Sequence, residues 1–120
     1  MHAGLKKLKG RGYDVDQALH RMLDDEVFYL KLLKTFSTDQ CIPALKKAMA
    51  ENNYKKAFEA FHKLKGSAVT LGLTPVAESV SKVLEDLRTS PPGDSLQSHY
   101  LQARNAIDDC LHLLKETIDL

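Results

Sequence analysis

The sequence contains no tryptophan and only two cysteines among its 120 residues. Cys41 and Cys110 lie far apart and match no metal-ligand spacing, so we expect two reduced thiols in a cytoplasmic protein, with a disulfide between them as the open alternative. No apolar run approaches the roughly 20 residues that a membrane span requires. The first twelve residues are basic but lack the apolar centre of a signal peptide.

The sequence also lacks an excess of charge of either sign. Its 17 basic and 16 acidic residues give a formal net charge of +1, so neither a nucleic acid nor a membrane surface is expected as a partner. It has no glycine-rich phosphate loop and no dinucleotide-binding glycine pattern, and it lacks room for an ATP-binding kinase domain. No two of its five histidines are spaced i,i+4, so no metal site is expected.

What the sequence does contain is a series of amphipathic helical patterns and no segment typical of a strand. We expect one domain, with residues 1–12 as a flexible N-terminal lead-in and residues 13–120 as the folded part. Short connections between long amphipathic helices imply antiparallel neighbours. The fold predicted is all-α, an up-down four-helix bundle with a short N-terminal capping helix.

Helix boundaries follow from caps and breaks. Asp14 caps the short first helix, which ends near Leu23. Residues 25–52 allow two interpretations because Pro43 cannot donate a helical hydrogen bond: one long helix bent near residues 39–43, or two helices with a break there. The remaining helices are expected over residues 54–72, 75–87 and 94–118, with the segment 88–94 as a simple connector.

The predicted helix over residues 54–72 carries a histidine that points away from the core. On a wheel of 100° per residue, the small and apolar residues of this helix fall opposite His62. The residues within about 60° of His62 on the same wheel are Lys55, Phe58, Glu59, Lys65, Gly66 and Val69.

Several of these neighbours indicate a working histidine. Lys65 places a cation one turn along the same face. Gly66 costs about 1 kcal/mol relative to alanine in a helix interior, and it removes the side chain that would block close approach. Phe58 and Val69 add apolar surface. Together these features favour a docking site for an anionic group carried by another protein, although spacing alone leaves an idle surface histidine as an equal alternative.

The run from His62 to Ala68, HKLKGSA, followed by Leu71-Gly72, resembles the signature of histidine-containing phosphotransfer (HPt) domains of bacterial-type phosphorelays. The family layout fits the chain from Asp14 to about Thr117. Phe61 departs from the pattern, since the family often has a small residue directly before the histidine. The resemblance also favours the single bent helix over residues 25–52, which is therefore the prediction.

The resemblance implies a phosphocarrier that has no kinase or hydrolase activity of its own. A receiver domain docks with its phosphoaspartate, and His62 accepts the phosphoryl group and passes it to another receiver. Lys65 steadies the phosphoryl oxygens as a point charge. No cofactor is expected on this chain, because the receiver brings the Mg²⁺. Docking is expected to involve Gly66, Phe58, Val69, Lys55 and Glu59.

The expected partners are response-regulator receiver domains and a hybrid sensor histidine kinase. The chain is expected to be a cytoplasmic monomer, and its initial methionine and full helical pattern are read as a free-standing protein. Two other functions stay open at this point. One is a helical module that binds receivers or other proteins without passing phosphate, and the other is an unrelated adaptor bundle in which the motif is a coincidence.

Overall fold

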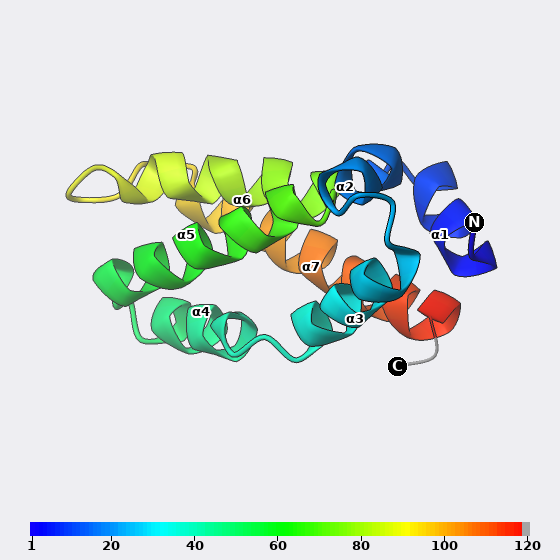
Figure 1. The fold of residues 1–120 in the computed structure, drawn as a ribbon. Helices are drawn as coiled ribbons and strands as arrows, with labels where there is room; N and C mark the ends of the chain where they lie inside the picture. Colours follow the sequence, from blue (N-terminus) through cyan, green and yellow to red (C-terminus); the bar gives the residue numbers. More distant parts are fainter. Residues whose placement is uncertain (119–120) are drawn as a thin grey trace.

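Over its described residues, 1–118, the protein consists of α-helices and contains no strand (Figure 1). The predicted all-helical fold is confirmed. None of the described helices is long and apolar enough to cross a membrane. In this computed structural model the helices are α1 (Ala3–Gly10), α2 (Val15–Arg21), α3 (Glu26–Ser37), α4 (Cys41–Ala50), α5 (Tyr54–Thr70), α6 (Thr74–Leu87) and α7 (Leu96–Ile118).

The last four helices pack against one another in chain order, α4 on α5, α5 on α6 and α6 on α7. The connections before and after α5 are three residues long, 51–53 and 71–73, as expected for antiparallel neighbours. Helix α3 and helix α1 both pack on α7 (Figure 1). Helix α5 therefore has α4 and α6 on its flanks and keeps one face open to solvent.

The buried face of α5 is built largely from small residues, which let the neighbouring helices approach closely. Ala57, Ala60 and Ala68 are buried, and Leu64 is fully buried. Phe61 is also fully buried, and its ring meets the ring of Tyr100 on α7 edge to face, with centroids 6.1 Å apart. The family departure noted at Phe61 is therefore a core residue rather than part of the open face.

Helix α1 corrects the prediction of a flexible lead-in over residues 1–12. Leu5 and Leu8 are fully buried where α1 packs on α7. Gly4 lies so close to the backbone carbonyl of Thr117 that a Cβ atom there would overlap it. The apolar stripe of α1 is only two leucines long, and these leucines are buried by a helix that begins more than 85 residues further along the chain. Local sequence patterns do not contain that information.

The segment over residues 25–52 corrects a second prediction, because it forms two helices rather than one bent helix. Helix α3 ends at Ser37 and α4 begins at Cys41. The Asp39 carboxylate accepts a hydrogen bond from the Cys41 backbone N–H at 2.7 Å within the connection, whereas the N-cap residue Gln40 makes no side-chain cap. Pro43 lies in the first turn of α4, where its missing N–H is not needed. The break therefore lies before Pro43, which the first turn of α4 accommodates.

Both ends of α5 are fixed by specific contacts. The Asn53 side chain accepts from the Lys56 backbone N–H at 3.2 Å and caps the N-terminus. Gly72 ends the helix in the left-handed region, at φ +71°, as the sequence predicted. A Cβ atom on Gly72 would overlap the Asp14 carbonyl. The Asp14 backbone N–H in turn donates to the Gly72 carbonyl at 2.8 Å, which ties the start of α2 to the end of α5.

Two side chains from other helices bind the last carbonyls of α5. The Arg21 guanidinium donates to the Val69 carbonyl at 2.8 Å and to the Thr70 carbonyl at 3.3 Å. The buried Tyr29 hydroxyl donates to the Leu71 carbonyl at 2.7 Å. The Val69 carbonyl also accepts from the Gly72 backbone N–H at 3.2 Å, and together these contacts stabilise the C-terminal end of the helix. Helix α5 is therefore a rigid support for the side chains on its open face.

Candidate functional site

His62 lies in the middle of α5 on the solvent-exposed face, as the helical wheel predicted. Its ring stacks on the ring of Phe58, one turn earlier, with centroids 5.9 Å apart and an interplanar angle of 20°. Within residues 1–118, no hydrogen bond or ion pair involves the imidazole of His62. The ring is therefore exposed to solvent, and its one described contact is the stacking on Phe58.

The backbone beside His62 is bare. Gly66 is exposed one turn further along, and a Cβ atom placed on it would meet nothing within 4 Å. No internal packing therefore requires a glycine at this position, although glycine weakens the helix. Val69 follows on the same face with 46% of its surface exposed. An apolar side chain and a side-chain-free patch next to an exposed imidazole form a surface that another protein can approach closely.

The other predicted site residues lie on the same helix. Lys65 is half-buried, whereas Lys55 and Glu59 are exposed on the N-terminal half of α5. The structure thus brings all seven predicted residues to the open side of one helix. Their individual roles stay predictions.

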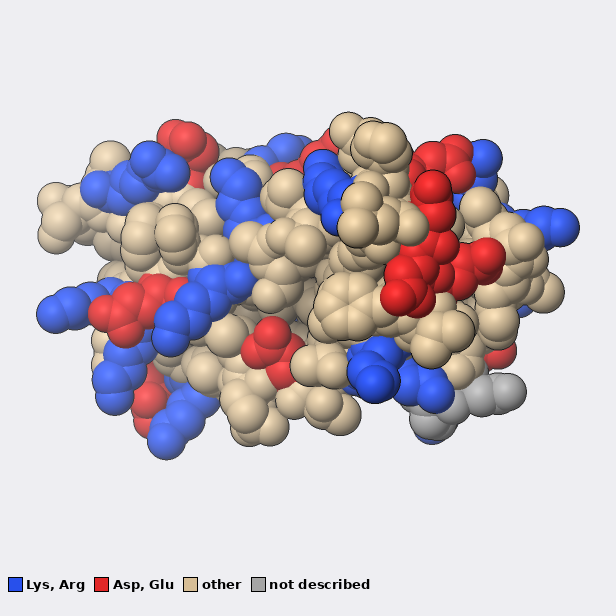
Figure 2. Space-filling view, viewed as in Figure 1, with Lys and Arg blue, Asp and Glu red and all other residues tan. Residues whose placement is uncertain are grey.

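The charge on this side of the molecule is uneven. Residues 41–65 contain six lysines and two glutamates, and five of these lysines form no ion pair within residues 1–118. Figure 2 shows basic side chains gathered over α4 and the start of α5, and acidic side chains around the connection between α2 and α3. The unpaired lysines are Lys47, Lys55, Lys56, Lys63 and Lys65, and the acidic residues at the connection are Asp24, Asp25 and Glu26.

The described part of the chain, residues 1–118, contains no group of three or more His, Cys, Asp or Glu side chains arranged to hold a metal ion. Both cysteines are free thiols. Burial raises the pKa of the Cys110 thiol to about 11, and burial also raises the pKa of Cys41, where the neighbouring Asp39 adds to the effect. Both thiols are therefore protonated at neutral pH and are weak nucleophiles. His62 is the better candidate for nucleophilic chemistry.

The sequence analysis missed one exposed apolar cluster. Val27 and Phe28 at the start of α3 are 76% and 47% exposed, and Leu23 just before them is 89% exposed. Leu23 and Asp24 both have positive φ, so the chain turns sharply there and directs this short segment outward.

A hollow of about 420 Å³ lies between α3 and α5, directly beside the bare backbone of Gly66. Leu32 and Phe36 of α3 and Lys63 of α5 contribute to its lining. Helix α3 therefore borders the site, although sequence reasoning placed every site residue on α5.

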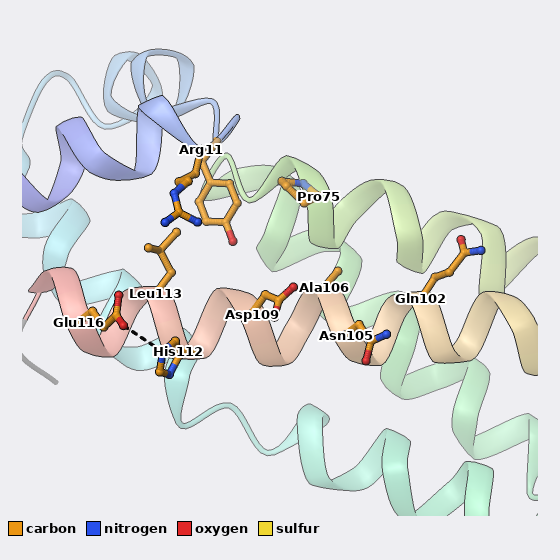
Figure 3. A pocket seen from close by; sticks show the side chains of 10 residues that line it. Arg11, Pro75, Gln102, Asn105, Ala106, Asp109, His112, Leu113 and Glu116 are labelled. Atoms are coloured by element: carbon orange, nitrogen blue, oxygen red, sulfur yellow. Dashed lines mark ion pairs between the residues drawn. The ribbon is translucent and has the colours of Figure 1, made fainter.

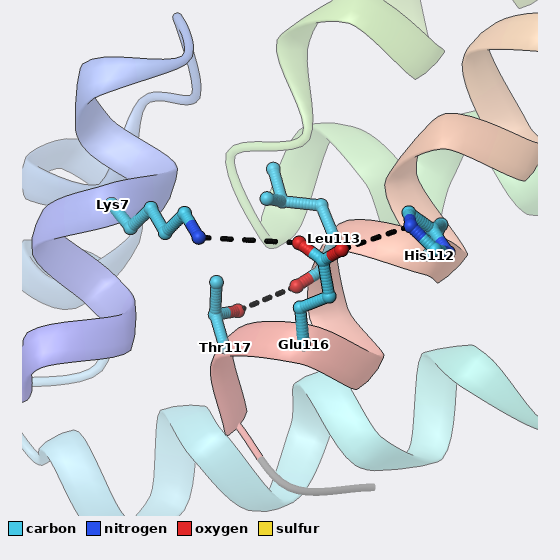
Figure 4. Close-up of polar contacts among 5 residues, drawn as sticks. All are labelled: Lys7, His112, Leu113, Glu116 and Thr117. Atoms are coloured by element: carbon cyan, nitrogen blue, oxygen red, sulfur yellow. Dashed lines mark hydrogen bonds and ion pairs between the residues drawn. The ribbon is translucent and has the colours of Figure 1, made fainter.

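A larger hollow, of about 760 Å³, lies on another side of the molecule, between the α1–α2 connection and α7 (Figure 3). Its lining is mostly polar and includes Arg11, Asn105 and Asp109. At its edge Glu116 pairs with His112 at 2.9 Å and with Lys7 of α1 at 3.9 Å (Figure 4). No residue of α5 lines this hollow, so it is separate from the face that carries His62.

Comparison with known families settles the class of this domain. A family model described as the Hpt domain matches residues 32–117, which is well over half of the chain. The chain belongs to the Hpt domain family. The resemblance read from the His62 run is thereby confirmed, and Hpt domains are histidine phosphotransfer modules that interact with receiver domains in two-component phosphorelays. Comparison with curated proteins and with solved structures gives no match.

The matched region of the Hpt domain begins inside α3 and ends near the end of α7. It contains the whole of α5, with His62, Lys65 and Gly66. Helices α1 and α2 lie outside it, yet α1 packs on α7 and Arg21 of α2 binds the end of α5. The segments outside the match are thus integral to the support of the Hpt helix.

Proposed function

We propose that this Hpt domain accepts a phosphoryl group on His62 from the phosphoaspartate of one receiver domain and passes it to a second receiver. The observation that carries the proposal is the position of His62 on the open face of α5, stacked on Phe58 and without a hydrogen-bond or ion-pair partner within residues 1–118. A catalytic histidine that served this chain's own chemistry would need a partner group to orient it. An imidazole turned toward solvent serves a reactant delivered from outside.

The transfer is a simple exchange of one bond for another. The lone pair of an unprotonated ring nitrogen attacks phosphorus, and the P–O bond to the receiver's aspartate breaks with its electron pair returning to the carboxylate. The other ring nitrogen keeps its proton, so no general base is required. Transfer to the second receiver is the reverse exchange with a different carboxylate. No water is consumed at any point.

The neighbours of His62 support this reaction from the chain's side. Lys65, one turn along, places an ammonium group where it attracts the oxygens of the transferring phosphoryl group. Gly66 keeps the backbone bare, so the receiver's loops can bring the phosphoaspartate to within about 3–3.5 Å of the ring nitrogen. The Mg²⁺ comes with the receiver. A hybrid sensor histidine kinase is the class of protein that would load the first receiver.

The test is a phosphotransfer assay against each receiver domain of the source organism, phosphorylated in turn. His62→Gln should abolish the transfer of label to this protein and leave the melting temperature nearly unchanged, because the side chain is exposed. His20→Gln, which changes an exposed histidine on α2, is the matched control and should transfer like the wild type. The label should be acid-labile and base-stable, as a phosphoramidate is.

Label that persists in His62→Gln would show that another residue accepts the phosphoryl group and would overturn the assignment. Receivers that bind without ever transferring label would favour a module that binds receivers and carries no phosphate.

A further inference from the structure

A second hollow borders the His62 face and is unused by the proposed transfer chemistry. It has a volume of about 530 Å³ and lies between the first turns of α5 and the segment that joins α6 to α7. We call it the loop groove. Its apolar part is formed by Tyr54, Phe58, Leu87 and Pro92. The sequence analysis treated residues 88–94 as a simple connector, but they form one wall of this hollow.

The loop groove is continuous with the surface around His62. Phe58 lines the groove and also stacks on the imidazole at 5.9 Å between centroids. A protein docked over His62 therefore covers the Phe58 ring and reaches the mouth of the groove without a gap.

The charged residues that line the loop groove indicate which kind of side chain it would bind. Lys55 and Arg88, both exposed, line it together with one exposed carboxylate, Glu59. Neither cation forms an ion pair within residues 1–118. The groove also lies at the basic end of this face, where the unpaired lysines of α4 and α5 gather (Figure 2). An apolar hollow with a net positive border is complementary to an apolar side chain accompanied by carboxylates.

We propose that the loop groove determines which receivers this Hpt domain accepts, by taking a receiver segment that carries an apolar side chain flanked by a carboxylate. The inference rests on the proposed function, because the occupant belongs to the same docked receiver. Lys55 and Arg88 are specificity residues in this scheme and do not touch the phosphoryl group. Receivers that lack the carboxylate dock more weakly, although the chemistry at His62 is the same for them.

The test reverses both charges in the double variant Lys55→Glu/Arg88→Glu. Transfer from a preferred receiver should lose roughly tenfold in kcat/KM, because two attractions at the border of an interface become repulsions. The loss should fall on KM rather than on kcat, and it should shrink as salt is raised from about 50 to 300 mM. One carboxylate-to-lysine change on the receiver's surface should restore transfer to the double variant.

The matched control is Lys6→Glu/Lys115→Glu, which makes the same change in net charge on exposed residues of α1 and α7. It should leave the transfer kinetics within about twofold of the wild type, because long-range charge effects are screened at these salt concentrations. An equal loss in the control, or a loss that does not depend on salt, would overturn the proposal.

Binding of unphosphorylated receivers, measured by fluorescence anisotropy, separates this proposal from the proposed function. If the groove variant binds receivers more weakly than the wild type but no label ever reaches His62, the specificity role of the loop groove is supported and the proposed phosphotransfer function is overturned. If label reaches His62 but the groove variant binds every receiver as tightly as the wild type does, the proposal for the loop groove alone would be overturned. Failure of every receiver to bind the wild type would overturn both.

Discussion

Gly66 offers a test in which stability and function should change in opposite directions. The glycine lies in the interior of α5, and a Cβ atom there would meet nothing within 4 Å. Gly66→Ala should therefore remove the conformational cost of glycine without creating a clash, and should stabilise the domain by about 1 kcal/mol. With an unfolding entropy of about 2.1 cal/mol/K per residue, a chain of 120 residues should gain about 4 °C in melting temperature.

The rate of phosphotransfer should fall in these variants, although their stability rises. Gly66→Leu should be about as stable as Gly66→Ala, because leucine is nearly as good a helix former. Its side chain would project into the space that a receiver must enter one turn from His62. Because transfer requires the reacting atoms to be about 3–3.5 Å apart, we expect kcat/KM of Gly66→Leu to fall on the order of a hundredfold. The value for Gly66→Ala should lie between those of Gly66→Leu and the wild type.

The measurements are a thermal melt followed by circular dichroism and single-turnover transfer from one active receiver. Gly10→Ala is the matched control, because Gly10 is a helical glycine of α1 whose added Cβ would also meet nothing within 4 Å. It should leave transfer unchanged. A fall in melting temperature for Gly66→Ala would refute the open geometry, and unchanged transfer in Gly66→Leu would refute the close approach.

Three further predictions concern the site and the core. Lys65→Ala should slow transfer roughly tenfold without changing the helix content, and a normal rate in rapid-quench kinetics would exclude a phosphoryl contact. Gly72→Ala should destabilise the domain by about 2 kcal/mol or more in urea unfolding, because its φ of +71° disfavours a side chain and the added Cβ would overlap the Asp14 carbonyl. Stability should fall between pH 9 and pH 11, because burial raises the pKa of the Cys110 thiol to about 11 and the unfolded chain releases that proton first, at a cost of up to about 1.4 kcal/mol per pH unit. In Cys110→Ala the fall over that range should be shallower, and an unchanged slope in urea titrations would show that another group is responsible.

Local signals were enough to predict the functional helix. The stop at Gly72 and the spacing of small apolar residues define α5, and the same periodicity places His62 on the open face. These properties depend on residues within a few turns of each other, so a single sequence contains them. The family motif then assigned a chemistry to the exposed ring, and the Hpt match over residues 32–117 confirmed the family.

Structural features that depend on contacts between distant residues, or on competing local contacts, could not be predicted from the sequence. Helix α1 is stabilised by α7, whose residues come more than 85 positions later, so its two leucines carry no signal by themselves. The break after Ser37 depends on which of two local hydrogen-bonding patterns is more stable, and the Asp39 side chain accepts from the Cys41 N–H within the connection. The loop groove requires residues of α5 and of the α6–α7 segment to meet, which no linear pattern displays.

The position of α1 and the end of α7 has a practical consequence for tethered proteins. Both lie at one end of a molecule 46 Å long, while α5 extends from the middle toward the other end (Figure 1). A receiver domain fused to either chain end must therefore cross a good part of that length to reach His62 of the same chain. A flexible linker of about 20 residues has a root-mean-square span of about 25 Å. Shorter linkers would lower the effective concentration of the fused receiver at His62 of the same chain, so they would favour exchange between separate molecules.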